Sequence, residues 1–243
     1  MLLSVIIPPF NEAETIRRIV KEVNKLPIDK EIIIVNDGST DGTSEILERI
    51  RDEPGLKIVQ CKKKRGKGFA IRLGLEHVTG HFVVIQDADL EVHPKDLLSI
   101  LEPLREKGVQ VVYGSRFRDG RKQASLQNYI ANRLLAGFVN LLYRVRITDE
   151  STCYKAFDTH LITNLNLTCE GFYFCPEVTA KVLRAGYSIR EVPISYSPRI
   201  EKQGKKLRFW CDGILAVWIL LKYRFTSKTE IFKKGIKVPV DLG

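Results

Sequence analysis

Short aliphatic runs alternate with longer amphipathic stretches through the first half of the chain. The runs are rich in Val and Ile and predict strands at LLSVIIP, EIIIV, LKIVQ, HFVVIQ and VQVVYG, which begin at residues 2, 31, 56, 81 and 109. Between them, apolar residues recur with helical spacing and predict helices over 12–25, 41–52, 67–78 and 94–107. Strands that alternate with helices in this way indicate an α/β fold, with a mostly parallel sheet flanked by helices.

The second half of the chain is less regular. Its pattern predicts a helix over 128–144, a polar turn over 148–155, a helix over 176–186, a strand over 189–196 and a last amphipathic helix over 207–225. No internal repeat, low-complexity tract or long linker interrupts the sequence. We therefore expect one domain over 1–225, followed by a C-terminal tail over 226–243.

Composition and charge narrow the class of partner. The 243 residues are 44% hydrophobic and 9% aromatic, which is enough apolar material for a buried core. Lys and Arg number 39 against 29 Asp and Glu, so the net charge is +10. Such a surplus attracts phosphates, nucleic acid or an anionic membrane surface, and it does not choose among them.

The cysteines and the N-terminus indicate a cytoplasmic protein. The five cysteines are odd in number and contain no C-x-x-C pair, so neither a disulfide framework nor a zinc ribbon is favoured. The first residues lack a basic start and soon reach Pro8 and Pro9, so we expect a buried strand there rather than a secretory signal. The uncharged run 213–221 would rise about 13 Å as a helix, which is too short to cross roughly 30 Å of hydrocarbon.

The residues that follow the predicted strands are the first candidates for function, because open α/β sheets bind ligands outside the carboxyl ends of their strands. In this chain those positions are polar, charged or rich in glycine. They are residues 8–12, 36–42, 62–68, 87–91 and 114–116.

An acidic pair, Asp87 and Asp89, directly follows one of these apolar strands. Two carboxylates at this spacing repel each other unless they are solvated or share a cation. A hard divalent ion shared with substrate phosphates would remove the repulsion, with Glu91 as a candidate third ligand. An exposed acidic turn is the alternative, and the position at a strand end favours the metal site.

Two other loops carry candidate nucleotide or phosphate chemistry. In NDGSTDGT, Asp37 is a candidate ligand for a base or ribose while its neighbours cap a helix, and the two roles are compatible. In KKKRGKG, glycines flank Arg65 and Lys67 at a helix N-terminus, a place that favours phosphate, whereas Lys62 and Lys63 fit a solvated charge run. The chain has no complete dinucleotide-binding fingerprint and no P-loop, which disfavours hydride transfer and excludes a P-loop ATPase.

The ordered motifs VIIPPFNE, VNDGSTDGT, DAD and GSR resemble glycosyltransferase family 2. Downstream, TDESTCYKAF, EGFYFCPEV, IREVPISYSPR and QGKK are similar to its polyprenyl-phosphate branch, of the dolichol-phosphate mannosyltransferase type. This resemblance implies a GT-A fold, a nucleotide-sugar donor, Mg²⁺ or Mn²⁺ as cofactor and inversion at the sugar carbon. It also divides the expected domain into a nucleotide-sugar-binding half over 1–116, an acceptor-side half over 117–206 and the amphipathic helix over 207–225.

The resemblance and the strand-end positions together give the expected site. The nucleotide-sugar-binding residues are Pro8, Asn11, Glu12, Asp37, Gly38, Lys67, Asp87, Ala88 and Asp89. The metal ligands are Asp87, Asp89 and Glu91, and the groups that support catalysis are Asp87, Asp89, Arg116 and Arg199. The acceptor phosphate is expected on Arg133, Arg199 and Lys205, with Lys206 beside them.

The expected reaction moves a hexose from a donor of the GDP-mannose or UDP-glucose class to a polyprenyl or dolichyl phosphate. A lipid phosphate is largely dianionic at pH 7, so it needs no strong general base, and the four histidines need not be catalytic. The sequence departs from the family at Pro9 and at Glu150 and Ser151, which weakens an acceptor-side role for the latter two, whereas Asp149 keeps its place. Glu177 is expected to border the acceptor or to order nearby cations, with a helix N-terminal acid as the alternative.

Two predicted helices carry apolar stripes that either contact a membrane or face the core. One stripe consists of Leu207, Trp210, Ile214, Trp218, Leu221 and Phe225, and the other of Leu134, Leu135, Phe138, Val139 and Leu142. Each basic residue near an anionic membrane surface adds about 1 kcal/mol of attraction. We therefore expect peripheral contact with the cytoplasmic face of a membrane, made directly or through a membrane-anchoring protein.

Three other functions fit parts of the sequence. A family 2 enzyme with a soluble sugar, polysaccharide or protein acceptor would need a catalytic carboxylate near that acceptor, and the missing Q-x-x-R-W motif disfavours polymer synthesis. A nucleic-acid-binding protein would interleave aromatic and basic residues, which KKKRGK does not do, so no nucleic-acid partner is expected. A sugar-nucleotide pyrophosphorylase would carry a G-x-G-T-R loop near the N-terminus, and this chain has none there.

Overall fold

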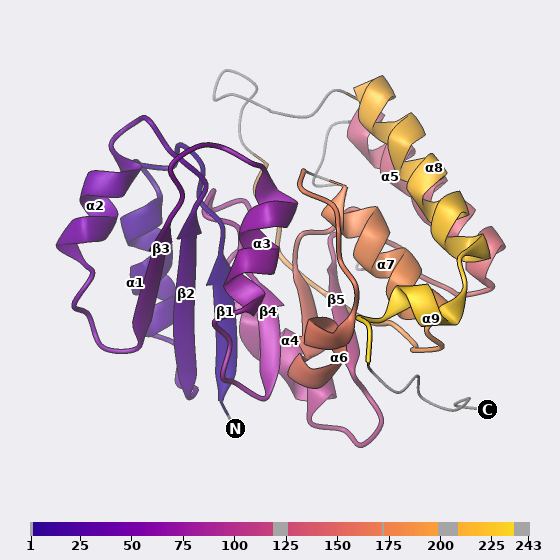
Figure 1. Ribbon diagram of the computed structural model, residues 1–243, viewed down its shortest axis with the longest axis horizontal. Coiled ribbons are helices and arrows are strands. Elements are labelled where there is room, and N and C mark those ends of the chain that lie inside the picture. The colour runs from indigo at the N-terminus through magenta and orange to yellow at the C-terminus, as the bar shows by residue number, and fades with distance from the viewer. Residues whose placement is uncertain (1, 119–125, 172, 199–208, 236–243) are drawn as a thin grey trace.

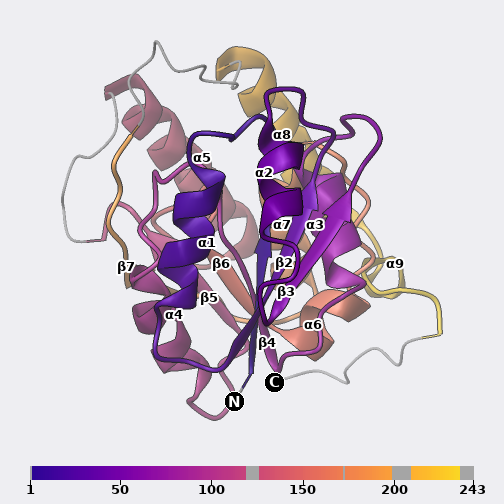
Figure 2. The ribbon, with the colours of Figure 1, turned by 90° about the vertical axis from the view of Figure 1, so that its left-hand side faces the viewer.

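The computed structural model describes residues 2–118, 126–171, 173–198 and 209–235, which form a sheet with helices on both faces (Figures 1 and 2). Its strands are β1 Leu3–Ile7, β2 Lys30–Asn36, β3 Leu56–Gln60, β4 Phe82–Ile85, β5 Val111–Ser115, β6 Lys155–Asp158 and β7 Arg190–Pro193. They are ordered β3-β2-β1-β4-β6-β5-β7 across the sheet. The pairs are parallel except those of β6, which runs antiparallel to β4 and β5. The mostly parallel α/β sheet expected from the sequence is confirmed.

Nine helices lie in the described residues. They are α1 Ile16–Asn24, α2 Thr43–Arg49, α3 Lys67–Leu75, α4 Asp96–Leu104, α5 Leu126–Tyr143, α6 Thr159–Asn164, α7 Phe174–Arg184, α8 Phe209–Phe225 and α9 Lys228–Ile231. Within these ranges, none of the helices combines the length and the apolar character that crossing a membrane requires.

The central strands β1, β2 and β4 are buried on both faces because aliphatic side chains occupy both sides of them. Leu3, Val5 and Ile7 of β1 pack into the core shared with α1, α2 and α4. Ile6 points the other way, into the core shared with α3, α5, α6, α7, α8 and α9. Figure 2 shows α1 and α4 on one side of the strands and α3 on the other. The sheet therefore lies between two hydrophobic cores, one on each face. The polar candidate residues lie in the loops at its edge.

Several predicted boundaries are corrected by the structure. The helix expected from residue 12 begins at Ile16, because residues 12–15 form a turn in which the amides of Thr15 and Ile16 both donate to the carbonyl of Glu12. The strand expected over 189–196 ends at Pro193, because Ser195 and Ser197 leave β5 and donate their amides to Asp96 and to the Glu91 carbonyl instead. Three elements were not predicted: β6, which begins inside the expected polar turn, and the short helices α6 and α9.

The apolar stripe of α8 faces away from the core. Ile214, Trp218, Leu221 and Phe225 are exposed, whereas the opposite side of the helix packs inward through Ala216, Ile219, Leu220 and Tyr223. For this stripe the core-facing alternative is wrong. Leu207 and the side chain of Trp210 lie outside the described residues.

The stripe of α5 is mostly core-facing. Val139 is fully buried, and Leu135, Phe138 and Leu142 pack against the core, whereas Leu134 is 70% exposed. Ile130 and Leu141 are exposed on the same helix, which lies beside α8 (Figure 1). We call the exposed side chains Ile130, Leu134, Leu141, Ile214, Trp218, Leu221 and Phe225 the α5/α8 apolar surface.

Candidate active site

The loops that follow β1, β2, β3 and β4 meet at one edge of the sheet, as parallel strands require, and two of them are tied together. The amide of Asn11 donates to the Ser39 hydroxyl at 2.9 Å, and the amide of Thr40 donates to the Asn11 side-chain carbonyl at 2.9 Å. The amide of Ala13 donates to Asp41 at 3.0 Å. Asn11 adopts a left-handed backbone, with φ of 55°, to make these contacts. The first two sequence motifs therefore bind each other.

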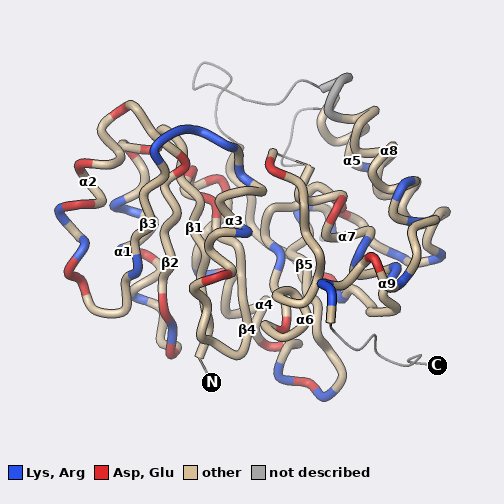
Figure 3. Tube along the Cα trace, in the orientation of Figure 1, with Lys and Arg blue, Asp and Glu red and all other residues tan. Residues whose placement is uncertain are grey.

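Asp37 holds the basic β3–α3 loop, which crosses the strand ends in Figure 3. Its carboxylate is 2% exposed and accepts the amides of Arg65 at 2.8 Å and Gly66 at 2.7 Å. The backbone of Lys63 lies so close to Gly38 that a Cβ there would be 2.5 Å from its carbonyl carbon, and φ at Gly38 is +69°. Asp37 and Gly38 therefore have a structural role that the sequence did not reveal, and their contact with a nucleotide stays a prediction.

The N-terminus of α3 is occupied by the chain itself. The amides of Gly68 and Phe69 donate to the carbonyls of Gly171 at 3.1 Å and Glu170 at 2.9 Å. The Arg65 side chain pairs with Glu170 and lies over the Phe69 ring. Two of the first amides of α3 therefore already have acceptors within the chain, and phosphate binding at Arg65 and Lys67 stays a prediction.

Lys67 and the acidic loop after β4 form the centre of the site. The Lys67 ammonium is paired with the Asp87 carboxylate. Burial alone would raise the pKa of Asp87, but Lys67 brings it below its usual value. Burial, together with the negative charges of Asp87 and Glu91, raises the pKa of Asp89 to about 7. The loop is strained at Leu90, between Asp89 and Glu91, because this residue adopts a φ of 62°. Ala88 is buried.

The acidic loop fits a metal that takes further ligands from a substrate. In the part of the chain that the structure describes, no three His, Cys, Asp or Glu side chains form a metal-binding group. The expected ligands Asp87, Asp89 and Glu91 thus do not form a metal site by themselves. Asp87 is instead paired with Lys67. Mg²⁺ is commonly held by one or two carboxylates together with substrate phosphates. The crowded charge around Asp89 is what such an ion would relieve.

Arg116 is fixed beside this loop by Asp149. The guanidinium Nε and one terminal nitrogen each donate to Asp149 at 2.7 Å, and the Arg116 amide donates at 3.0 Å. The Asn132 side chain of α5 donates to the same carboxylate at 2.8 Å. Burial alone would raise the pKa of Asp149, but Arg116 holds it below its usual value. The positive charge of Arg116 also lowers the pKa of Asp87, so the cation acts at the acidic loop.

A strap after β7, residues 194–198, crosses to the acidic loop. The Tyr196 hydroxyl donates to the Glu91 carboxylate at 3.0 Å, and the amide of Ser197 donates to the Glu91 carbonyl at 2.8 Å. The amide of Ser195 donates to Asp96 at 2.8 Å. The Tyr196 ring also lies 5.1 Å from the Arg116 guanidinium. Tyr196 thus links Glu91 to Arg116, which sequence reasoning missed.

The remaining predicted nucleotide contacts lie on the same edge. Pro8 is partly exposed after β1, and the Pro9 carbonyl accepts the amide of Asp37 at 3.0 Å. The Glu12 carboxylate accepts the Thr15 hydroxyl at 2.9 Å, and its amide donates to Thr43 at 3.0 Å. These contacts place Glu12 in the turn that leads into α1.

The expected acceptor residues are only partly described. Arg133 is exposed on α5 and donates to the Thr148 carbonyl at 3.2 Å. Arg199, Lys205 and Lys206 lie outside the described residues. Glu150 is buried, which raises its pKa, and Ser151 donates to it at 3.3 Å.

Glu177 lies in the first turn of α7, as the helix N-terminal alternative predicted, and it also has a structural role that the sequence did not reveal. It is fully buried, pairs with Lys181 at 2.7 Å and accepts the amides of Thr168 and Cys169 at 2.8 Å. The Tyr223 hydroxyl of α8 donates to it at 3.1 Å. It therefore orders the segment that leads into the cap of α3, rather than arginines around an acceptor.

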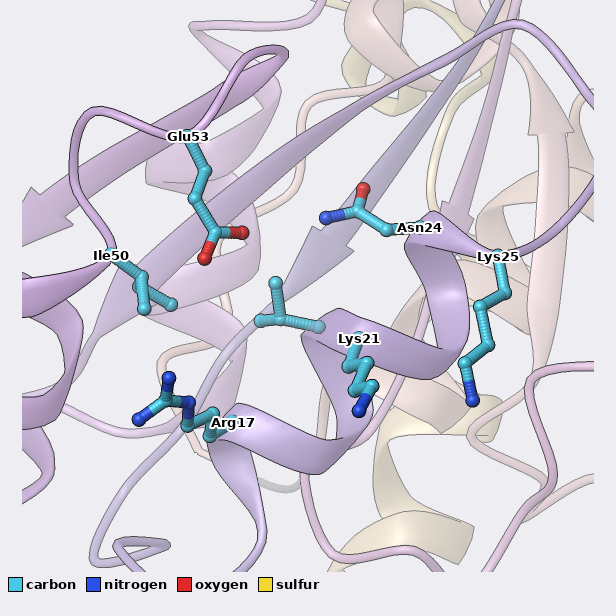
Figure 4. Close-up of a pocket in the computed structure, with 7 residues that line it drawn as sticks. Arg17, Lys21, Asn24, Lys25, Ile50 and Glu53 are labelled. Carbon is cyan, nitrogen blue, oxygen red and sulfur yellow. The ribbon is translucent and has the colours of Figure 1, made fainter.

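A surface hollow of about 450 Å³ lies between α1 and the turn after α2 (Figure 4). It is lined by Arg17, Val20, Lys21, Asn24, Lys25, Ile50 and Glu53. None of the candidate site residues lines it, so it is separate from the strand-end site.

Comparison with known proteins identifies relatives along nearly the whole chain. It is 29% identical over 233 residues to Glycosyltransferase AglJ of Haloferax volcanii, covering 95% of this chain and 74% of that protein. It is 28% identical over 264 residues to Dolichyl-phosphate beta-glucosyltransferase of Saccharomyces cerevisiae, covering 98% of this chain and 78% of that protein.

Among solved structures, the fold is similar to that of glucosyl-3-phosphoglycerate synthase from Mycobacterium tuberculosis, determined with Mn²⁺, uridine diphosphate and phosphoglyceric acid. The TM-score is 0.71 at 22% identity, and the match covers 93% of this chain and 79% of the other. The expected GT-A fold is confirmed. Residues 4–163 match the family model described as Glycosyl transferase family 2. The chain is therefore a glycosyltransferase and belongs to glycosyl transferase family 2.

Proposed function

We propose that the chain transfers a hexose, with inversion, from a nucleoside diphosphate sugar of the GDP-mannose or UDP-glucose class to a polyprenyl or dolichyl phosphate. In this proposal residues 1–116 bind the donor, 117–206 bind the acceptor head group and 207–225 contact the membrane. The enzyme works at the cytoplasmic face of a membrane, as a peripheral protein. The relative from Saccharomyces cerevisiae, named as a dolichyl-phosphate glucosyltransferase, supports this acceptor class.

The observation that supports a lipid acceptor is that α5 has a polar contact to the site on one side and exposed apolar residues on the other. Asn132 turns inward and holds Asp149, the partner of Arg116. Its neighbours Ile130 and Leu134 are exposed and belong to the α5/α8 apolar surface. Arg133 lies between them in sequence and is exposed as well. One helix thus offers apolar contact for a lipid chain and polar groups for its phosphate.

The donor half supplies charge where the leaving group departs. A nucleoside diphosphate leaves with its negative charge, and Lys67 and Arg116 are cations held beside Asp87. A divalent cation, held by Asp89 together with Asp87 or Glu91, would neutralise part of the same charge when bound. The solved relative with Mn²⁺ and uridine diphosphate supports both the donor class and the metal.

The acceptor half needs cations more than a base. A phosphate monoester is largely dianionic at neutral pH and attacks the sugar carbon without losing a proton. Arg133, with Arg199 and Lys205, would hold that phosphate in line with the departing diphosphate. The reaction then depends on positioning and on electrostatic stabilisation of the leaving group.

A donor and acceptor panel tests the proposal. Purified protein is incubated with Mn²⁺ or Mg²⁺, a short polyprenyl phosphate, and radiolabelled GDP-mannose, UDP-glucose or UDP-N-acetylglucosamine. We expect label from one donor to enter the organic phase, and Asp89→Ala or a chelator to abolish it. Ser195→Ala is the control and should retain activity, because Ser195 lies on the same strap but contacts Asp96 rather than Glu91.

Radiolabel that remains in the aqueous phase would contradict the proposal of a lipid acceptor. Label that stays in the aqueous phase on a soluble sugar, while polyprenyl phosphate receives none, would assign a hydroxyl acceptor instead. Binding of nucleotide without transfer to any acceptor would contradict the proposal as well.

A further inference from the structure

The start of α3 is held between two parts of the chain that lie far apart in sequence. On one side, Asp37 accepts backbone amides of the β3–α3 loop at 2.7 and 2.8 Å. On the other side, the segment 168–171 provides two carbonyl groups that accept the amides of Gly68 and Phe69 at 3.1 and 2.9 Å. The loop and Lys67, the first residue of α3, therefore depend on this segment for their position.

The contact between the segment 168–171 and the start of α3 is close. A Cβ on Gly66 would lie 2.5 Å from the Glu170 carbonyl oxygen, and a Cβ on Gly68 would lie 2.5 Å from the Cys169 carbonyl oxygen. The two backbones thus leave no space for even a methyl group between them. A displacement of the segment would therefore be passed on to the residues that flank Lys67.

Glu177 of α7 fixes this segment with both of its carboxylate oxygens. One oxygen accepts the amide and the hydroxyl of Thr168, each at 2.8 Å, and the other accepts the amide of Cys169 at 2.8 Å. Lys181 pairs with the carboxylate at 2.7 Å, and the two side chains are only 0% and 1% exposed. A buried carboxylate with this many donors has a fixed orientation, so it is a rigid anchor for the segment.

Tyr223 connects α8 to the same anchor. Its hydroxyl donates to Glu177 at 3.1 Å and lies 3.2 Å from the Thr168 hydroxyl. The tyrosine is buried on the inward side of the helix. Contacts with printed partners therefore run from α8 through α7 and the segment 168–171 to the start of α3.

We propose that Glu177 and Tyr223 are positioning residues for the donor. They fix the segment 168–171, which in turn fixes the β3–α3 loop and Lys67 in the arrangement that binds a nucleoside diphosphate. This inference rests on the proposed function, in which that loop receives the donor. A loop that is already held in its binding arrangement needs less ordering when the ligand binds, so release of the segment should weaken nucleotide binding.

Tyr223→Phe is the first test, because it removes one hydroxyl and leaves the ring in place. We expect the affinity for UDP or GDP with Mn²⁺, measured by calorimetry on the folded full chain, to fall about threefold to tenfold. Tyr143→Phe is the matched control. The Tyr143 hydroxyl also bonds to α8, at 2.8 Å from the Leu220 carbonyl, but not to Glu177, so nucleotide affinity should stay unchanged.

Glu177→Gln tests the anchor itself, since an amide has one acceptor atom where the carboxylate has two. Because this change alone leaves the Lys181 charge buried without a partner, it is combined with Lys181→Met. We expect the double variant to bind nucleotide about tenfold more weakly than wild type. Without nucleotide, amide hydrogen exchange over residues 62–75 and 164–171 should be faster than in wild type.

Two results would overturn the proposal. One is unchanged nucleotide affinity in the double variant despite faster exchange in both segments. The other is an equal loss of affinity in Tyr223→Phe and Tyr143→Phe, which would indicate general loosening of α8. The lipid acceptor does not enter these assays, so a protein that binds nucleotide as expected but glycosylates no lipid would contradict the proposed function alone.

Discussion

Ionisation of Asp89 lowers the free energy of unfolding of the protein. Its pKa rises from 3.8 to about 7, because it is buried next to Asp87 and Glu91. The folded pKa lies above the unfolded one, so the ionised carboxylate destabilises the protein increasingly as pH rises from about 4, and fully above about 7. Carboxylates in this condition are common at sites that bind cations.

We therefore predict that Asp89→Asn stabilises the metal-free protein at pH 8. The free energy of unfolding should increase by a few kcal/mol, since each unit of pKa shift corresponds to about 1.4 kcal/mol. At pH 4 the gain should nearly vanish. Urea denaturation in EDTA at both pH values measures it, and a variant less stable than wild type at pH 8 would contradict the argument. The same variant should lose glycosyl transfer.

Gly38 offers a second prediction at this scale. Gly38→Ala should destabilise the protein by about 3 kcal/mol, because it adds a clash with the Lys63 backbone to the strain of a positive φ. Gly108→Ala is the matched control, with φ of 90° and no atom within 4 Å of the added Cβ. It should cost only about 1 kcal/mol, the strain alone. Equal losses in urea denaturation would show that the clash is relieved by loop movement.

At the scale of elements, Glu31 joins the N-terminal ends of several strands. Its carboxylate accepts the Ser4 hydroxyl of β1 at 2.6 Å and the amide of Thr79 at 2.6 Å, and it pairs with Lys57 of β3 at 3.0 Å. Burial alone would raise the pKa of Glu31, but these contacts lower it from 4.5 to about 2. The stabilisation is therefore complete above about pH 4.5 and is lost as pH falls through 2.

We predict that Glu31→Gln lowers the free energy of unfolding by about 3 kcal/mol at pH 7. The difference should shrink as pH falls toward 2, because the wild-type carboxylate then takes up a proton. Urea denaturation at pH 7 and pH 3 measures the trend. A loss that is the same at both pH values would point to packing rather than to charge.

The strap after β7 gives a prediction about the acidic loop. Tyr196→Phe removes the hydrogen bond to Glu91 but keeps the ring beside Arg116. We expect Mn²⁺ binding in the presence of UDP or GDP to weaken up to about tenfold, since hydrogen bonds to charged groups contribute about 1.5 kcal/mol. Ser195→Ala, which removes a hydroxyl contact to Asp96, is the control and should leave binding unchanged. Equal effects would mean that the strap acts only as a structural support.

The elements differ in how far the sequence determined them. Strands β1 to β5 were predictable because each contains a short run rich in Val, Ile or Leu. β6 was not, since KAFD offers no aliphatic run and its pairing with β4 and β5 depends on residues far away. Helix α3 was predicted, but its capping by Glu170 and Gly171 was not.

The candidate site divides in the same way. Asp87 and Asp89 could be predicted because they follow a strand directly. The partners Arg116 and Asp149 lie 33 residues apart, and Tyr196 lies 105 residues from Glu91. Local pattern contains no information on such pairs, because only the folded sheet brings them together.

At the scale of the whole molecule, the α5/α8 apolar surface and the charge of +10 support the proposal that the protein contacts an anionic membrane. We predict that Trp218→Ser and Phe225→Ser each reduce binding to vesicles of anionic phospholipid by about tenfold or more, because burial of a large apolar side chain contributes about 1.5–3 kcal/mol. Co-sedimentation measures the loss. Leu98→Ser, a change at an exposed leucine on α4, is the control, and an equal loss there would contradict a defined docking surface.

The position of β6 also governs how the protein is made. β5 pairs with β6 and β7, and β4 meets β5 only through β6. While the ribosome is still translating the residues before 155, β1 to β4 can already form a sheet, but β5 has no neighbour to join. β5, and with it Arg116, can therefore join the sheet only after β6 has been synthesised. Insertion of β6 between β4 and β5 therefore joins the two halves of the active site late in synthesis, and the strap that carries Tyr196 is made later still.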